Sequence, residues 1–97
     1  MMAARYLLAV AAVLAPVATA TAAEPPAGAA SCTGCHAANA RVDTAIPRIA
    51  GRPAADLVSQ MQAFKSGQKP STVMDRIAKG FTDEEMAAIA AWFAQQK

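Results

Sequence analysis

The sequence has few of the side chains on which most enzymes and metal sites are built. Its 97 residues include two cysteines, one histidine, one tryptophan and one tyrosine. Charged residues make up 16% of the chain, and nine Lys and Arg stand against seven Asp and Glu. This near balance excludes a nucleic-acid-binding protein built on a basic stripe. The apolar fraction of 55% excludes a disordered chain, and the length has room for one small domain.

The first 23 residues are typical of a secretory signal peptide. Arg5 supplies a positive charge, residues 6–15 form an apolar run, and small residues follow near the expected cleavage site. Pro16 interrupts the run, which is shorter than the roughly 20 apolar residues of a membrane-spanning helix. A single arginine does not indicate the twin-arginine export route. We therefore expect Sec export to the periplasm, removal of residues 1–23, one domain over residues 24–97 and no stable membrane insertion afterwards.

The mature chain is small for a stable fold. Removing 23 residues from 97 leaves 74. A core of that size rarely contributes more than about 3–5 kcal/mol by itself, so such domains add a disulfide, a metal or another internal support. A disulfide between Cys32 and Cys35 would close a loop too short to restrict the unfolded chain much. Another stabilising group is therefore expected within the fold.

The run Cys32-Thr33-Gly34-Cys35-His36 matches the attachment sequence for c-type haem. Two thiols three positions apart lie on neighbouring parts of a helical turn, where they can form thioethers with the two vinyl groups along one haem edge. His36 is then placed to be the proximal iron ligand. The motif thus predicts one covalent haem c, attached through Cys32 and Cys35, which would supply the missing core.

Three other uses of the same residues remain open. A thioredoxin-like redox pair would need a βαβ surround, but no strand periodicity follows the motif. A zinc site could draw only on Cys32, Cys35 and His36, whose near contiguity is poor for a closed tetrahedral shell. A structural disulfide suits an oxidising compartment but leaves His36 without a role.

Helical periodicity and capping signals predict an all-α fold of about four short helices around the haem. We expect a first helix over residues 27–35, a loop over 37–52, a second helix from Pro53 to about Ser66 closed by Gly67, a short helix between Ser71 and Gly80, and a last helix from Thr82 nearly to Lys97. Apolar stripes on the second and last helices should be buried. The small residues of the first helix permit close approach, with Trp92 or Phe93 as the expected neighbours.

The histidine count narrows the choice of the second axial iron ligand. A single histidine excludes bis-histidine ligation and leaves a methionine, a weaker ligand such as lysine or water, or an open site. Met61 and Met86 fall in phase with apolar neighbours and are expected in the core. Met74 follows His36 by 38 residues, which is enough for the loop and second helix to pass around the haem. Met74 is therefore the predicted distal ligand; the alternative is simple packing beside Ile77.

Three further stretches carry a resemblance to a known family: Ile46 to Gly51, Phe64 to Gly67 and Ser71 to Phe81. Together with the haem motif they resemble class I cytochromes c, and among these the single-haem cytochrome subunits of flavocytochrome c sulfide dehydrogenases. The resemblance covers essentially all of residues 24–97. It implies the small class I cytochrome c fold and a role in sulfide oxidation.

The resemblance also implies roles for particular residues. Met74 would be the sixth iron ligand, and the backbone carbonyl of Pro47 would accept a hydrogen bond from the free ring nitrogen of His36. Such a bond fixes the plane of the imidazole and its basicity.

Electron transfer is the predicted function. Histidine and methionine together hold iron in both oxidation states, and the thioether favours the ferrous state. No Ser, Cys or carboxylate pair is arranged for acid–base or nucleophilic work, so the domain should catalyse nothing itself. The resemblance implies as partner a flavoprotein that would oxidise sulfide and pass on electrons one at a time. The alternatives are a freely diffusing cytochrome c, a gas-binding haem protein with an open sixth site, and a disulfide module without haem.

Overall fold

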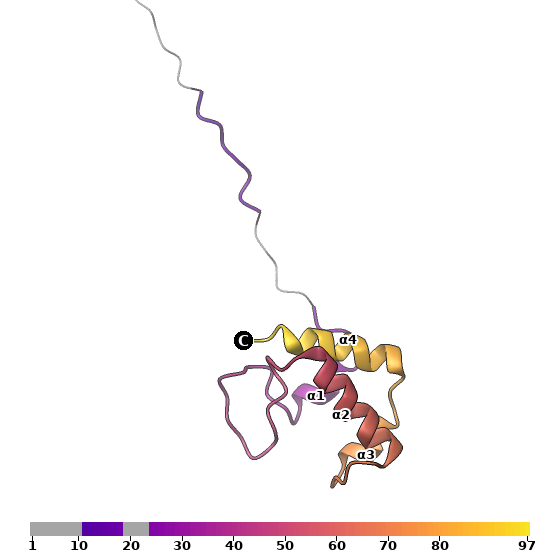
Figure 1. Ribbon diagram of the computed structural model, residues 1–97. Coiled ribbons are helices and arrows are strands. Elements are labelled where there is room, and N and C mark those ends of the chain that lie inside the picture. The colour runs from indigo at the N-terminus through magenta and orange to yellow at the C-terminus, as the bar shows by residue number, and fades with distance from the viewer. Residues whose placement is uncertain (1–10, 19–23) are drawn as a thin grey trace, which may run out of the picture.

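The structure, a computed structural model, describes residues 11–18 and 24–97 (Figure 1). The predicted signal peptide, residues 1–23, lies outside the described residues except for 11–18, which are exposed and have no regular secondary structure. No helix in the described ranges has both the length and the hydrophobicity needed to cross a bilayer.

Four α-helices form the domain: α1 (Ala29–Thr33), α2 (Ala54–Ser66), α3 (Met74–Ala78) and α4 (Asp83–Ala94). The described part of the chain contains no strand, so the predicted all-α fold of four short helices is confirmed. Helix α2 packs against both α3 and α4, while α1 and the long loop after it close the other side (Figure 1). This arrangement brings residues from all four helices around one interior space.

The first helix is shorter than predicted. Gly28 has a φ of 88°, in the left-handed region, so the helix cannot extend back to residue 27. At the other end, the backbone N–H groups of Cys35 and His36 both donate to the carbonyl of Cys32, at 3.1 and 2.8 Å. These bonds turn the chain tightly after α1 and keep the two cysteines and the histidine together.

Helix α2 begins and ends almost as the sequence predicts. Pro53 occupies the N-cap position, one residue before the helix, and its carbonyl accepts hydrogen bonds from Asp56 and Leu57. Gly67 ends the helix with a φ of 79°, as expected for a left-handed C-cap. The N–H of Lys69 then donates to the carbonyl of Ala63 at 3.1 Å, which completes the turn toward α3.

The predicted capping box of α4 is confirmed. The N–H of Glu85 donates to Thr82 Oγ1 at 3.2 Å, and the N–H of Thr82 donates to Glu85 Oε1 at 3.0 Å. The hydrogen bond from the Thr82 N–H holds the pKa of Glu85 below its ordinary value. The helix ends at Ala94, earlier than the expected end near Lys97.

The buried core is small and rich in alanine. A single cluster joins α1, the loop, α2 and α4; its members are Ala29, Ala50, Leu57, Ile89, Ala90 and Phe93. Phe93 shares this cluster with Ala29, and Trp92 packs edge-on against Phe93 with ring centroids 4.9 Å apart. The residue that closes over the start of α1 is Phe81, because a Cβ at Gly28 would lie 2.6 Å from Phe81 Cε1.

Gly28→Ala is expected to lower the free energy of unfolding by more than Gly67→Ala does. An alanine at a left-handed position costs about 1–2 kcal/mol, which applies to both sites. Only at Gly28 does the new Cβ meet the Phe81 ring, and overpacking adds about 1–3 kcal/mol; a Cβ at Gly67 meets nothing within 4 Å. Guanidinium unfolding of both variants measures the difference, and equal losses would contradict the packing of Phe81 on Gly28.

Candidate functional site

A cavity of about 490 Å³ lies at the centre of the domain, within the size range of cofactor sites. Most of its wall is apolar. The apolar contributors from the loop and the helices include Ile46, Ile49, Leu57, Met61, Phe64, Met74, Ile77, Met86, Ile89 and Phe93. The cavity therefore suits a large apolar group with a few polar attachment points.

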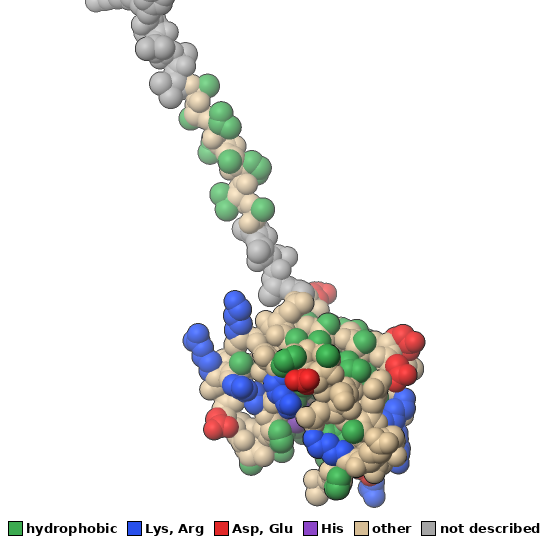
Figure 2. Space-filling view, viewed as in Figure 1, with side chains coloured by type: hydrophobic (Ala, Val, Ile, Leu, Met, Phe, Trp, Pro, Cys, Tyr) green, Lys and Arg blue, Asp and Glu red, His purple; other side chains and the backbone are tan. Residues whose placement is uncertain are grey.

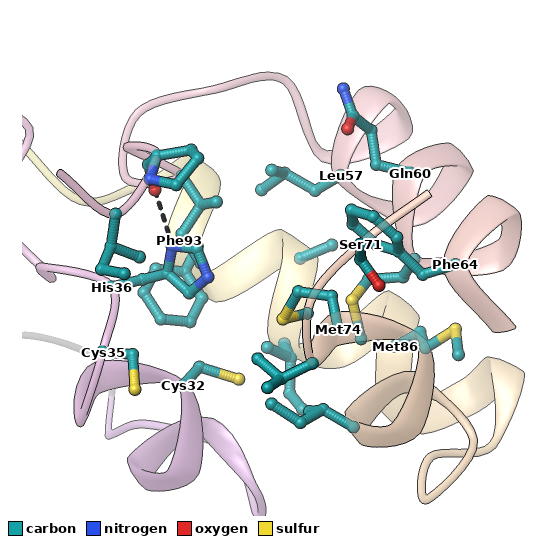
Figure 3. A pocket seen from close by; sticks show the side chains of 18 of the residues that line it. Cys32, Cys35, His36, Leu57, Gln60, Phe64, Ser71, Met74, Met86 and Phe93 are labelled. Carbon is teal, nitrogen blue, oxygen red and sulfur yellow. Dashed lines mark hydrogen bonds between the residues drawn. The ribbon is translucent and has the colours of Figure 1, made fainter. Parts of the chain in front are cut away.

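The haem motif forms one wall of this cavity. Cys32, Cys35 and His36 all line it, and Figure 3 shows them together on the same side. Both thiols are free; Cys32 is half-buried at the end of α1, and Cys35 is exposed in the turn that follows. Burial raises the pKa of the Cys32 thiol, so this cysteine is not an activated nucleophile.

His36 is held by the loop that crosses the top of the cavity. Its Nδ1 lies 2.6 Å from the carbonyl oxygen of Pro47, and Figure 3 shows this contact as a dashed line. A carbonyl only accepts, so Nδ1 carries the proton in this bond and Nε2 keeps its lone pair. That nitrogen lies on the cavity side of the ring, where it is available to a metal (Figure 3).

Met74 lies on the cavity wall opposite His36, at the first position of α3 (Figure 3). The side chain is half-buried. Hydrogen bonds just ahead of it fix the start of this helix: the N–H of Asp75 donates to Ser71 Oγ at 2.9 Å, and the Ser71 hydroxyl donates to Asp75 Oδ1 at 3.2 Å. The backbone N–H of Arg76 and the Ser71 hydroxyl lower the pKa of the Asp75 carboxyl.

The other two methionines differ in their surroundings. Met86 is 1% exposed, as expected for a core residue. Met61 is only half-buried, so it is less buried than expected for a core residue, although both methionines line the cavity. The apolar stripe of α2 packs against α3 and α4 and also faces the cavity, so a residue on this stripe is not always fully buried. Helical phase alone therefore does not separate Met61 from Met74.

Several polar residues line the cavity that no sequence pattern predicted to be there. The Lys69 Nζ donates to Gln60 Oε1 and lies 5.0 Å from the centre of the Phe64 ring. Arg52 is half-buried on the same cavity. Lys69 and Arg52 suit carboxylate groups of a ligand. Only the packing of separate segments brings them together, so no local pattern could have revealed them.

The other uses of the motif residues find little support. Within residues 11–18 and 24–97 no group of three or more His, Cys, Asp or Glu is placed to hold a metal ion, so there is no closed zinc shell. The strands of a thioredoxin-like βαβ unit are likewise missing from these ranges. What the residues do fit is haem: two free thiols at the attachment spacing, an imidazole nitrogen open to iron, and a large apolar cavity.

The fold and site thus define a small helical haem-binding domain of the c type. Sequence comparison agrees: the protein-family model for cytochrome c matches residues 27–97. The chain belongs to the cytochrome c family, and the resemblance found in the sequence is confirmed. Its cofactor is one covalently attached haem c, and the domain is an electron carrier.

Two of the similar proteins are named for dehydrogenases of sulfide or thiosulfate. The chain is 41% identical over 63 residues to the cytochrome subunit of sulfide dehydrogenase of Chlorobaculum tepidum, covering 65% of this chain and 57% of that protein. Identity to a thiosulfate dehydrogenase electron acceptor of Thiomonas intermedia is 36% over 78 residues, covering 78% and 36%. Cytochrome c-554(548) of Halomonas halodenitrificans is 32% identical over 71 residues, covering 69% and 86%. The chain thus spans less than two thirds of the first two relatives.

Proposed function

We propose that this chain carries single electrons in the periplasm, with His36 and Met74 as the axial iron ligands and Cys32 and Cys35 as the thioether links. The observation that carries the proposal is the placement of His36 and Met74 on facing walls of one apolar cavity (Figure 3). The signal-like residues 1–23 support the periplasmic location. Bound haem supplies an iron that alternates between the ferric and ferrous states.

The chain's own groups prepare this site for small changes on electron transfer. The Pro47 carbonyl engages Nδ1 of His36, which directs Nε2 into the cavity and would make it a stronger donor to iron. The thioether of Met74 is a soft ligand that favours ferrous iron. Leu57 and Phe93 are buried on the wall, so they keep water from the interior and lower its dielectric constant.

Met74→Ala is expected to remove the weak long-wavelength band of sulfur–iron coordination from the ferric spectrum. The variant should also bind carbon monoxide when ferrous and have a lower reduction potential, because the thioether no longer favours ferrous iron. Absorption spectroscopy and potentiometric titration provide the measurements.

Met61→Leu is the matched control for Met74→Ala, since it removes the other half-buried thioether of the cavity with little change in volume. The band should persist in this variant. A band lost in Met61→Leu and kept in Met74→Ala would assign ligation to Met61. Ready binding of carbon monoxide by the unaltered protein would instead favour a gas-binding domain with an open sixth site.

The proposed electron donor is a flavoprotein of the sulfide dehydrogenase type. The 41% identity to the cytochrome subunit of Chlorobaculum tepidum supports this choice. Removal of the predicted signal peptide takes away Arg5 and leaves eight basic and seven acidic residues. The mature chain therefore lacks the strong charge bias that steers many diffusing carriers. Figure 2 shows both signs of charge on the visible face.

Gel filtration of native periplasmic extract tests this partner. A stable complex should elute with haem and flavin in the same fractions, at a size well above that of the 74-residue mature chain, at low and high salt. Haem that elutes only at the size of the free chain, without flavin at any salt concentration, would favour a freely diffusing carrier.

A further inference from the structure

The carbonyl that holds His36 belongs to the peptide unit between Pro47 and Arg48. A peptide unit is planar, so the direction of this carbonyl depends on how the backbone is fixed on both of its sides. The unit lies in the irregular loop between α1 and α2, and both Pro47 and Arg48 are exposed there (Figure 1). Burial therefore does not hold this carbonyl in place, and something else must.

The side chain of Arg48 spans the loop. Its Nη1 donates to the carbonyl of Ala40 at 2.9 Å, eight residues earlier in the chain. Ala40 is half-buried and packs against the buried core cluster. A Cβ built at Gly51 would lie only 3.4 Å from Ala40 Cβ, and Gly51 itself donates its N–H to the Phe93 carbonyl at 2.9 Å. Arg48 is thus tied to a part of the loop that is anchored on α4.

Apart from the bonds made by His36 and Arg48, the side-chain hydrogen bonds described for this loop act locally. The N–H of Arg41 donates to Asn39 Oδ1 at 2.8 Å, and the hydroxyl of Thr44 donates to the Ile46 carbonyl at 3.1 Å. Each spans two residues and shapes one turn. The bond from Arg48 joins the beginning of the loop to the residue directly after Pro47.

We propose that Arg48 is a positioning residue that holds the Pro47 carbonyl on Nδ1 of His36 and so tunes the reduction potential. This inference rests on the proposed ligation of iron by His36. A firm hydrogen bond at Nδ1 makes the imidazole a stronger donor, which favours ferric iron. Loosening the bond should therefore raise the potential. Loss of a positive charge near the iron has the opposite effect on the potential. It stabilises the ferric state and so lowers the reduction potential.

Three variants of the holoprotein test the proposal: Arg48→Ala, Arg48→Lys and, as the matched control, Arg41→Ala. Arg41 is an exposed arginine of the same loop for which only a backbone hydrogen bond is described, so its removal reproduces the change in charge. Two quantities are measured in each variant. They are the reduction potential and the solvent-exchange rate of the His36 Nδ1 proton, followed by NMR of the ferrous protein.

In Arg48→Ala the Nδ1 proton should exchange faster, on the order of fivefold, as expected for the loss of one charge-assisted hydrogen bond at the surface. The potential of this variant should lie above that of Arg41→Ala. Arg48→Lys keeps the charge and a donor, so it should return both quantities toward those of the unaltered protein. If Arg48→Ala does not yield folded holoprotein, Arg48→Gln replaces it, with the same directions expected.

Equal exchange rates and potentials in Arg48→Ala and Arg41→Ala would overturn the proposal. So would an Arg48→Ala variant with a lower unfolding midpoint but an unchanged exchange rate and reduction potential. Failure of His36 ligation has a separate signature. In that case the unaltered protein already lacks a low-spin ferric spectrum and any dependence of the His36 proton shifts on oxidation state.

Discussion

The constraint on which this domain depends is the shortage of side chains to fill its interior. Among the residues that the structure describes, half of the eight buried hydrophobic ones are alanines, and Phe93 and Met86 have the largest fully buried side chains. The helices instead surround a cavity of about 490 Å³. A covalently attached haem would fill this cavity with a large apolar surface and so supply the core that the side chains do not. Folding and cofactor binding are therefore coupled in this chain, with the motif at Cys32 to His36 as the proposed attachment site.

The same arrangement explains how a domain with so few reactive groups can transfer electrons. Its single histidine is engaged on one ring nitrogen by a backbone carbonyl and open on the other. The opposite wall offers thioethers, and the space between is apolar. Each of these features favours an iron that changes its charge with little rearrangement around it.

Local chemistry explains which parts of this picture could be predicted from the sequence. The capping box of Thr82 and Glu85 and the left-handed turn at Gly67 each depend on a few neighbouring residues, and both occur where expected. The short extent of α1 differs from the prediction because Gly28 adopts a left-handed φ, a choice that the neighbouring residues do not dictate. A helical stripe predicts which side of a helix is covered but not by what, so the periodicity of α2 could not show that Met61 lies on the cavity wall.

The central claim is that the helices and the haem site form a single cooperative unit. Guanidinium unfolding of the holoprotein tests it most directly when followed both by haem absorbance and by far-ultraviolet circular dichroism. If the haem is the core, the two signals should change in one coincident transition, because α2, α3 and α4 have little other interior to pack on. Helical signal that persists well beyond the loss of the native haem spectrum would contradict the claim.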